Sequence, residues 1–144
     1  VNDLLRRLTA PHPAPLPEPA GRLALGAMLV RVAKSDGSYA VEEIQRIDRI
    51  LAQTYELNPV EAARLRADSE RLETVAPEDG RFTDAVRACT DKEDREAILV
   101  ELWQVILADG VERIEEDTYL HRAAERLGLD EAAIERAHKE AAQG

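Results

Sequence analysis

A short acidic signature that occurs twice is the feature that most constrains what this chain can fold into. The first copy consists of Asp36-Gly37 and of Glu42-Glu43, which begins five residues after the glycine. The second copy consists of Asp109-Gly110 and of Glu115-Glu116 at the same spacing, and an offset of 73 positions, from 36 to 109, aligns the two. Repetition at a fixed offset indicates that one structural unit is used twice. The sequence therefore predicts two similar helix–turn–helix units with carboxylates at their turns.

Apolar residues around the two signatures recur at helical spacing and match at the same offset. The matched pairs are Leu25 with Ile98, Leu29 with Leu102, Val32 with Val105 and Ile47 with Leu120. Residues three, four and seven positions apart share one face of a helix, and no stretch of the sequence shows the two-residue alternation of a half-buried strand. Because aromatic residues make up only 3%, the core must consist of aliphatic side chains. We therefore predict an all-α fold of about seven helices, in which two pseudo-symmetric helical hairpin units form one bundle-like domain.

The first 19 residues differ in character from the rest of the chain. Leu4, Leu5 and Leu8 have helical spacing, and a proline occupies every second position from Pro11 to Pro19. Prolines at this density exclude a helix and favour an extended, polyproline-like segment. We predict an N-terminal helix and a proline-rich strap over residues 1–19, and a helical domain over residues 20–144. The strap is interpreted as a stiff linker, with a ligand for a proline-binding domain as the alternative.

Two helix starts can be located from residues that cap helices. Asn58 is followed by Pro59 and Glu61, which predicts a capping box with Asn58 as the N-cap and proline at the first helical position. Thr90 is followed three residues later by Glu93, which predicts a second capping box with Thr90 as the N-cap.

Charge and cysteine content restrict the classes of partner. The formal net charge of -10 at pH 7 repels nucleic acid and anionic lipid, and it favours cations or a basic protein surface. The single cysteine, Cys89, excludes an internal disulfide and suits a reducing compartment. No apolar run approaches the roughly 18 residues that span a bilayer. We expect a cytoplasmic protein with a protein partner, no nucleic acid and no direct membrane span, and tethering through a partner remains open.

The acids of the two signatures admit two interpretations. Asp36 and Asp109 follow the end of a helix, where the helix dipole disfavours a carboxylate, whereas the glutamates fall in the first turn of the next helix, where it is favoured. In the first interpretation, the aspartates bond to turn amides and the glutamates are N-terminal charges. In the second, Asp36, Glu43, Asp109 and Glu116 bind a divalent cation such as Ca²⁺ or Mg²⁺ through oxygen. The spacing is not that of an EF-hand, and these four residues are the candidate metal ligands.

The order of an apolar helix, Asp-Gly, a short turn, a glutamate and a second apolar helix resembles the TerB family of tellurite-resistance proteins. The pattern covers Val30–Leu51 and again Val105–Leu127, and the resemblance extends over about residues 22 to 139. It implies an all-α fold of two pseudo-symmetric units and a bacterial protein, cytoplasmic or membrane-associated, linked to stress or tellurite response. It also implies an ion-sensing role for the family's acidic residues, which correspond here to the same four candidate ligands. The N-terminal helix and the strap are not part of the family's pattern.

Two classes of function follow from these residues. The first is a non-enzymatic interaction module that is gated by a divalent cation at the doubled turn. The second is a metal-dependent hydrolase that uses paired carboxylates, but it needs an open metal position, a base and oxyanion donors in a pocket. His121 could add a nitrogen ligand, although a surface histidine beside acids is the simpler interpretation, and the spacing of Trp103 indicates a core residue. We expect no enzymatic activity and no cofactor other than the cation.

Overall fold

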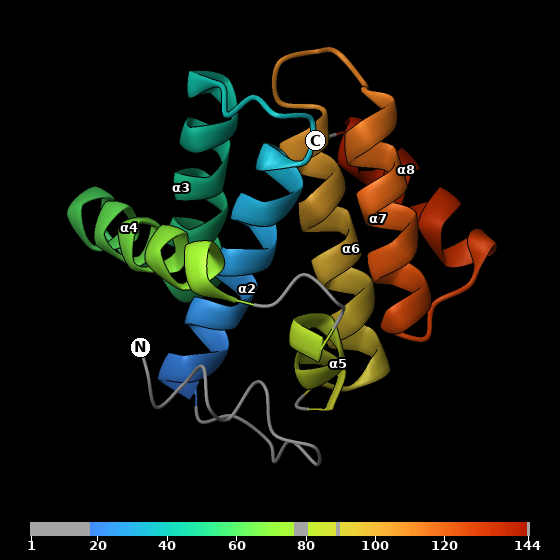
Figure 1. Cartoon of the computed structure of the whole chain (residues 1–144), viewed down its shortest axis with the longest axis horizontal. Coiled ribbons are helices and arrows are strands. Elements are labelled where there is room, and N and C mark those ends of the chain that lie inside the picture. The colour runs from blue at the N-terminus through green and yellow to red at the C-terminus, as the bar shows by residue number, and fades with distance from the viewer. Residues whose placement is uncertain (1–17, 77–80, 89, 144) are drawn as a thin grey trace.

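Seven α-helices make up the described part of the chain, which comprises residues 18–76, 81–88 and 90–143 of the computed structural model. The helices are α2 (Glu18–Lys34), α3 (Val41–Tyr55), α4 (Pro59–Val75), α5 (Arg81–Ala88), α6 (Lys92–Ile106), α7 (Ile114–Arg126) and α8 (Glu131–Gln143). These residues contain no strand, so the predicted all-α fold of about seven helices is confirmed (Figure 1).

The predicted N-terminal helix and most of the proline-rich strap lie outside the described residues, as does Cys89. The first described helix, α2, begins at Glu18, so Pro19 falls within its first turn. Proline is tolerated there because the N–H that it lacks has no acceptor within the helix. None of the described helices combines the length and the apolar character that crossing a membrane requires.

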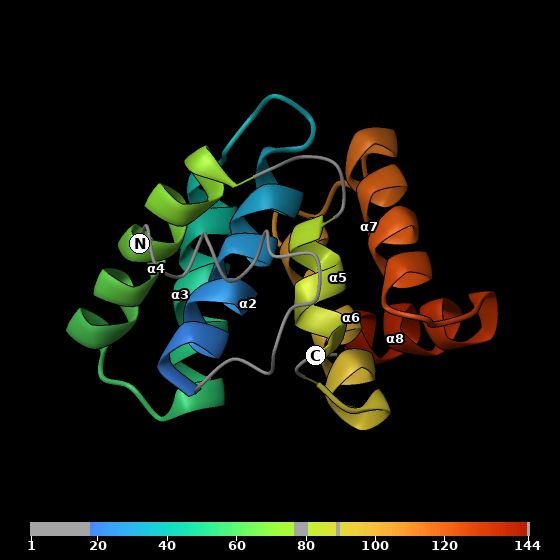
Figure 2. The ribbon, with the colours of Figure 1, turned by 60° about the horizontal axis from the view of Figure 1, so that its bottom comes forward.

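Two helices, α2 and α6, lie side by side through the middle of the molecule (Figures 1 and 2). In Figure 1, α3 and α4 lie on one side of this pair, and α7 and α8 lie on the other. The predicted aliphatic core is confirmed, because the largest fully buried side chains include Met28, Leu29, Ile47, Leu51, Leu72, Leu99, Leu102, Ile106, Leu120 and Leu127. Trp103 is also buried, with its ring edge-on to His138 at a centroid distance of 4.4 Å, so its assignment to the core is confirmed.

One of the two predicted capping boxes is confirmed, whereas the N-cap of α6 lies one residue later than predicted. Asn58 Oδ1 accepts a hydrogen bond from the Glu61 N–H at 2.8 Å, and Glu61 Oε1 accepts one from the Asn58 N–H at 3.0 Å. At the start of α6 the N-cap is Asp91, whose Oδ1 accepts from the Asp94 N–H at 2.8 Å. The prediction of Thr90 as this cap is wrong, because its hydroxyl donates backwards to the Val86 carbonyl at 2.7 Å.

Candidate functional site

The glycines of the two signatures have matching backbone geometry. Gly37 has φ of 80° and Gly110 has φ of 78°, in the left-handed region that glycine adopts at low cost. The Gly37 N–H donates to the Lys34 carbonyl, and the Gly110 N–H donates to the Leu107 carbonyl, both at 3.0 Å. Each glycine therefore reverses the chain directly after a helix, at positions that the 73-residue offset aligns.

The aspartates of the two signatures also have matching local contacts. Asp36 Oδ1 accepts a hydrogen bond from the Ser38 N–H at 2.9 Å, and Asp109 Oδ1 accepts one from the Val111 N–H at 3.0 Å. In both turns the bond spans two residues, as in an Asx-turn. The predicted bonding of these acids to turn amides is thus observed, and the pseudo-symmetry of the whole hairpin units stays a prediction.

The glutamates lie deeper than the interpretation as simple N-terminal charges requires. Glu43 is 1% exposed and Glu116 is 0% exposed. Glu43 Oε1 accepts a hydrogen bond from the Ala40 N–H at 3.0 Å, which is the capping contact of α3. The second oxygen of Glu43 and both oxygens of Glu116 are buried and have no hydrogen-bond partner of regular geometry in the described part of the chain. Buried carboxylate oxygens in this state require a proton or a cation.

A single arginine, Arg113, connects the acids of the two turns. Its guanidinium lies 2.7 Å from Asp109 Oδ2, 3.3 Å from Asp36 Oδ2 and 3.7 Å from Glu116 Oε1. Glu43 lies beside Glu116, close enough to raise its pKa. We call these five residues, Asp36, Glu43, Asp109, Arg113 and Glu116, the acid–arginine cluster. The structure therefore brings the four predicted ligands together, with an arginine among them that the sequence analysis missed.

The missed arginine left a signal in the alignment of the repeats. Arg113 is the N-cap of α7, and the same 73-residue offset pairs it with Ala40, the N-cap of α3. A residue with a long cationic side chain thus replaces alanine in the stretch between the matched glycines and glutamates, where Ser38 and Tyr39 are also replaced, by Val111 and Glu112. Comparing the two copies for differences, as well as for matches, gives Arg113 as the one position in this stretch where a cation is gained.

Burial and charge act in opposite directions on two acids of this cluster. Burial would raise the pKa of Asp109, but the hydrogen bonds from Arg113 and from the Val111 N–H outweigh it, so this pKa is lowered. Burial raises the pKa of Glu116 to about 9, with further increases from the carboxylates of Glu43 and Asp36 and a smaller opposing effect of Arg113. At neutral pH, therefore, Asp109 is ionised and Glu116 holds a proton.

The donor chemistry of the cluster suits a hard cation, but its present arrangement suits the arginine. Carboxylate oxygens are the ligands that Ca²⁺ and Mg²⁺ prefer. Among the residues that the structure describes, no three His, Cys, Asp or Glu side chains are arranged to hold a metal ion. The guanidinium of Arg113 makes the cationic contacts with Asp36 and Asp109. A metal ion would fit here only after this side chain moves, and the assignment of the four acids as metal ligands stays a prediction.

His121, considered from the sequence as an additional nitrogen ligand, makes other contacts. Its Nδ1 lies 2.8 Å from the Asp117 carbonyl oxygen, and its Nε2 lies 3.7 Å from Glu131 Oε2. The ring is exposed on α7 and faces the start of α8, in agreement with the interpretation as a surface histidine beside acids.

Comparison with known proteins identifies the family. The family model described as "Tellurite resistance protein TerB" matches residues 22–139, which is more than half of the chain and includes both acidic signatures. Comparisons with curated proteins and with solved structures gave no match. The resemblance drawn from the doubled signature is therefore confirmed over the same residues.

Proposed function

Because this chain belongs to the TerB family of tellurite-resistance proteins, we propose that it is a non-enzymatic interaction module of a bacterial stress or tellurite response. A divalent cation at the acid–arginine cluster gates its binding to a protein partner. The observation that supports this proposal is the convergence of carboxylates from both repeats on one arginine. The cluster links the turn between α2 and α3 to the turn between α6 and α7, so its charge balance acts on both units. We also propose a cytoplasmic location.

The gating mechanism that we propose is an exchange of cations. The side chain of Arg113 is 35% exposed whereas that of Asp36 is 4% exposed, so the guanidinium can leave toward solvent while the carboxylates stay in place. A divalent ion would then bind Asp36 and Asp109, and it would displace the proton from Glu116. The buried carboxyl of Glu116, which now interacts with that of Glu43, would bind the ion instead. The released arginine would change the surface charge beside both turns, where a partner could sense it.

The alternative of a metal-dependent hydrolase has no observation in its favour in the described part of the chain. Such an enzyme needs a base and oxyanion donors beside an open metal position. The contacts of the acids described above are turn amides, a cap amide and Arg113.

Thermal unfolding with and without divalent ions tests the proposal. The melting temperature should rise with millimolar Ca²⁺ or Mg²⁺ and return with chelator. An ion that binds only the folded state adds about 2.7 kcal/mol at a concentration 100 times its dissociation constant. The Asp36→Asn/Asp109→Asn variant should lose this response. The control Glu125→Gln/Glu135→Gln removes two exposed acids outside the cluster and should keep it. An unresponsive wild type, or equal responses in both variants, would contradict the proposal.

The variant Arg113→Gln tests the exchange step separately. Removing the competing guanidinium should increase the affinity for the divalent ion, because the ion no longer has to displace a charged group. If the ion binds this variant more weakly, Arg113 is not a competitor.

Gating is tested by comparing partner capture from the native host with ions and with chelator. The Asp36→Asn/Asp109→Asn variant should capture equally in both conditions.

A further inference from the structure

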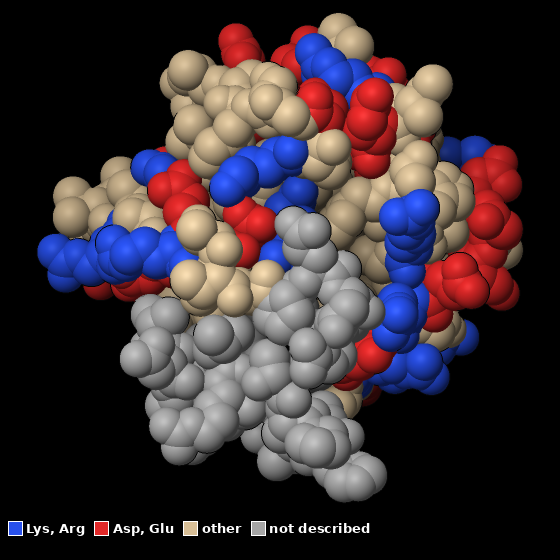
Figure 3. All heavy atoms as spheres, in the orientation of Figure 1, with Lys and Arg blue, Asp and Glu red and all other residues tan. Residues whose placement is uncertain are grey.

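A second charged feature of the molecule shares no residue with the acid–arginine cluster. A cleft of about 700 Å³ opens between the last turns of α2 and α4 on one side and the second half of α7 on the other. Its charged lining consists of Arg31, Lys34, Glu73, Arg122 and Arg126. Among the described lining residues, four are cationic and one is a carboxylate, although the whole chain has a net charge of -10. In Figure 3, Lys and Arg atoms lie both over the α2–α4 side and along α7.

One wall of the cleft holds its cations in fixed positions. Arg31 Nη2 donates to the carbonyl oxygens of Glu73 and Ala76 at 3.2 and 3.1 Å, so the guanidinium caps the end of α4. Lys34 Nζ lies 2.8 Å from Glu73 Oε1. Arg31 Nε lies 3.3 Å from Glu73 Oε2, so two cations share this carboxylate, the only one in the described lining. These two cations are therefore held in place before any ligand arrives.

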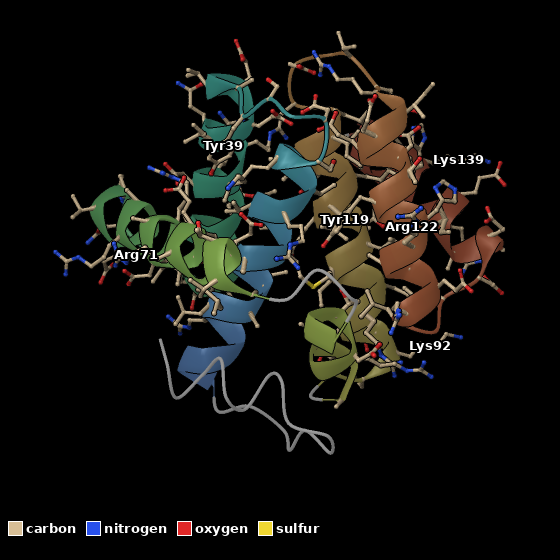
Figure 4. All side chains as sticks on the ribbon, viewed as in Figure 1. Tyr39, Arg71, Lys92, Tyr119, Arg122 and Lys139 are labelled. Atoms are coloured by element: carbon tan, nitrogen blue, oxygen red, sulfur yellow. The ribbon has the colours of Figure 1, made fainter. Side chains whose placement is uncertain are left out.

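The opposite wall offers hydrogen-bond donors. Arg126 pairs with Asp84 at 2.8 Å, whereas the exposed Arg122 makes no ion pair with any residue that the structure describes. Tyr119 lies one turn before Arg122, and Figure 4 places it between α2 and α7. Its hydroxyl is buried in the cleft wall beside the hydroxyl of Thr83, which also lines the cleft and acts to lower the pKa of Tyr119. Burial raises the pKa of Tyr119 to about 12, so the hydroxyl remains a donor.

We propose that this cleft binds a small oxyanion, either an inorganic one or the phosphoryl group of a metabolite, with Arg122 and Tyr119 as direct contacts. Guanidinium groups match the geometry of such oxygens with paired N–H donors. The Tyr119 hydroxyl, which is buried beside Thr83, would donate a further hydrogen bond to the ligand. Arg31 and Lys34 supply further positive charge from the opposite wall. This site does not depend on the cation at the acid–arginine cluster.

An NMR titration tests the site with inorganic phosphate and with tellurite as separate probes. Each titration is run with chelator and at constant ionic strength, balanced with sodium chloride. Amide signals of residues that line the cleft should shift saturably with at least one of the two probes, and the responding probe indicates the class of anion. Shifts that do not saturate, or that spread over the whole surface with both probes, overturn the proposal.

Two variants and a control distinguish a specific binding site from general electrostatic attraction of anions. Arg122→Gln should weaken the binding of the responding probe about tenfold, which corresponds to about 1.4 kcal/mol. Because Arg122 is exposed, this variant should fold normally. Tyr119→Phe should also weaken binding, since it removes only the hydroxyl. Arg71→Gln removes a cation of α4 that does not line the cleft and should leave the affinity unchanged (Figure 4). Equal losses in Arg71→Gln and Arg122→Gln would overturn the proposal.

Discussion

Replacing Glu116 with glutamine should stabilise the protein at neutral and alkaline pH, and the gain should grow as the pH rises. Glu116 is fully buried, and its pKa is raised from 4.5 to about 9. A carboxyl group whose pKa is higher in the folded state binds a proton more tightly there than in the unfolded chain. Stability is therefore lost progressively as the pH rises from about 4.5 to about 9, which is opposite to the usual behaviour of a paired acid.

The size of this effect follows from the width of the pH window. Each pH unit in the window costs at most about 1.4 kcal/mol, so the cost between pH 4.5 and pH 7 is at most about 3 kcal/mol. We expect the actual cost at pH 7 to be smaller, about 2 kcal/mol. The partly exposed Arg113, whose guanidinium lies 3.7 Å from Glu116, stabilises the ionised form and so reduces the cost. Glutamine carries no charge at any pH. It avoids this cost, and because Glu116 holds a proton at neutral pH, the variant loses little of the long contact with Arg113 there.

Urea unfolding at pH 5, 7 and 8.5 in the presence of chelator measures the difference. Glu116→Gln and the wild type should have similar stability at pH 5. The variant should then be more stable by about 1–2 kcal/mol at pH 7, with a larger gain at pH 8.5. Glu115→Gln is the matched control, since it removes the adjacent exposed glutamate and should change little at any pH. A difference that does not vary with pH, or a variant less stable than the wild type at pH 8.5, would refute the reasoning.

Two further predictions concern the packing and the ends of the helices. In Gly26→Ala, the new Cβ would lie 2.8 Å from Ser69 Cβ and would overlap its hydroxyl. The overpacking cost of about 1–3 kcal/mol should therefore exceed the roughly 1 kcal/mol that alanine adds to a helix. Urea unfolding should show a net loss that Gly26→Ala/Ser69→Gly partly reverses, and an unchanged midpoint would argue against close packing of α2 on α4. Asn58→Ala should cost about 1 kcal/mol in thermal unfolding, because it removes the N-cap of α4. A neutral result would mean that this cap is satisfied by solvent.

The helices and the core could be predicted from the sequence because burial depends on local periodicity. The apolar positions matched by the 73-residue offset have matching burial. Leu29 and Leu102 are both fully buried, and Leu25 and Ile98 are both 6% exposed. A side chain at a given position of an amphipathic helix faces the core regardless of which distant residue it meets there. Pattern alone therefore predicts that such a residue is buried, although it does not identify its contacts.

The position of the α6 N-cap shows where local pattern is insufficient. Thr90 and Asp91 are adjacent, and both residue types cap helices well. The choice between them depends on whether the Thr90 hydroxyl is free, and in the structure it is bonded to the Val86 carbonyl at the end of α5. That bond reaches back four residues into α5, which ends at Ala88, whereas α6 begins at Lys92. The sequence allows both capping arrangements and does not rank them.

The sequence analysis predicted the four acids of the acid–arginine cluster but missed Arg113, and the reason is physical. The acids repeat, so they stand out in a comparison of the chain with itself, whereas Arg113 occurs in only one copy. Its contacts nevertheless extend to both copies, to Asp36 from the first and to Asp109 and Glu116 from the second. The cap of the first copy, Ala40, has no side chain that could do the same. The cluster is therefore a property of the two units together, since each signature alone supplies acids and only their juxtaposition gives Arg113 its full set of partners.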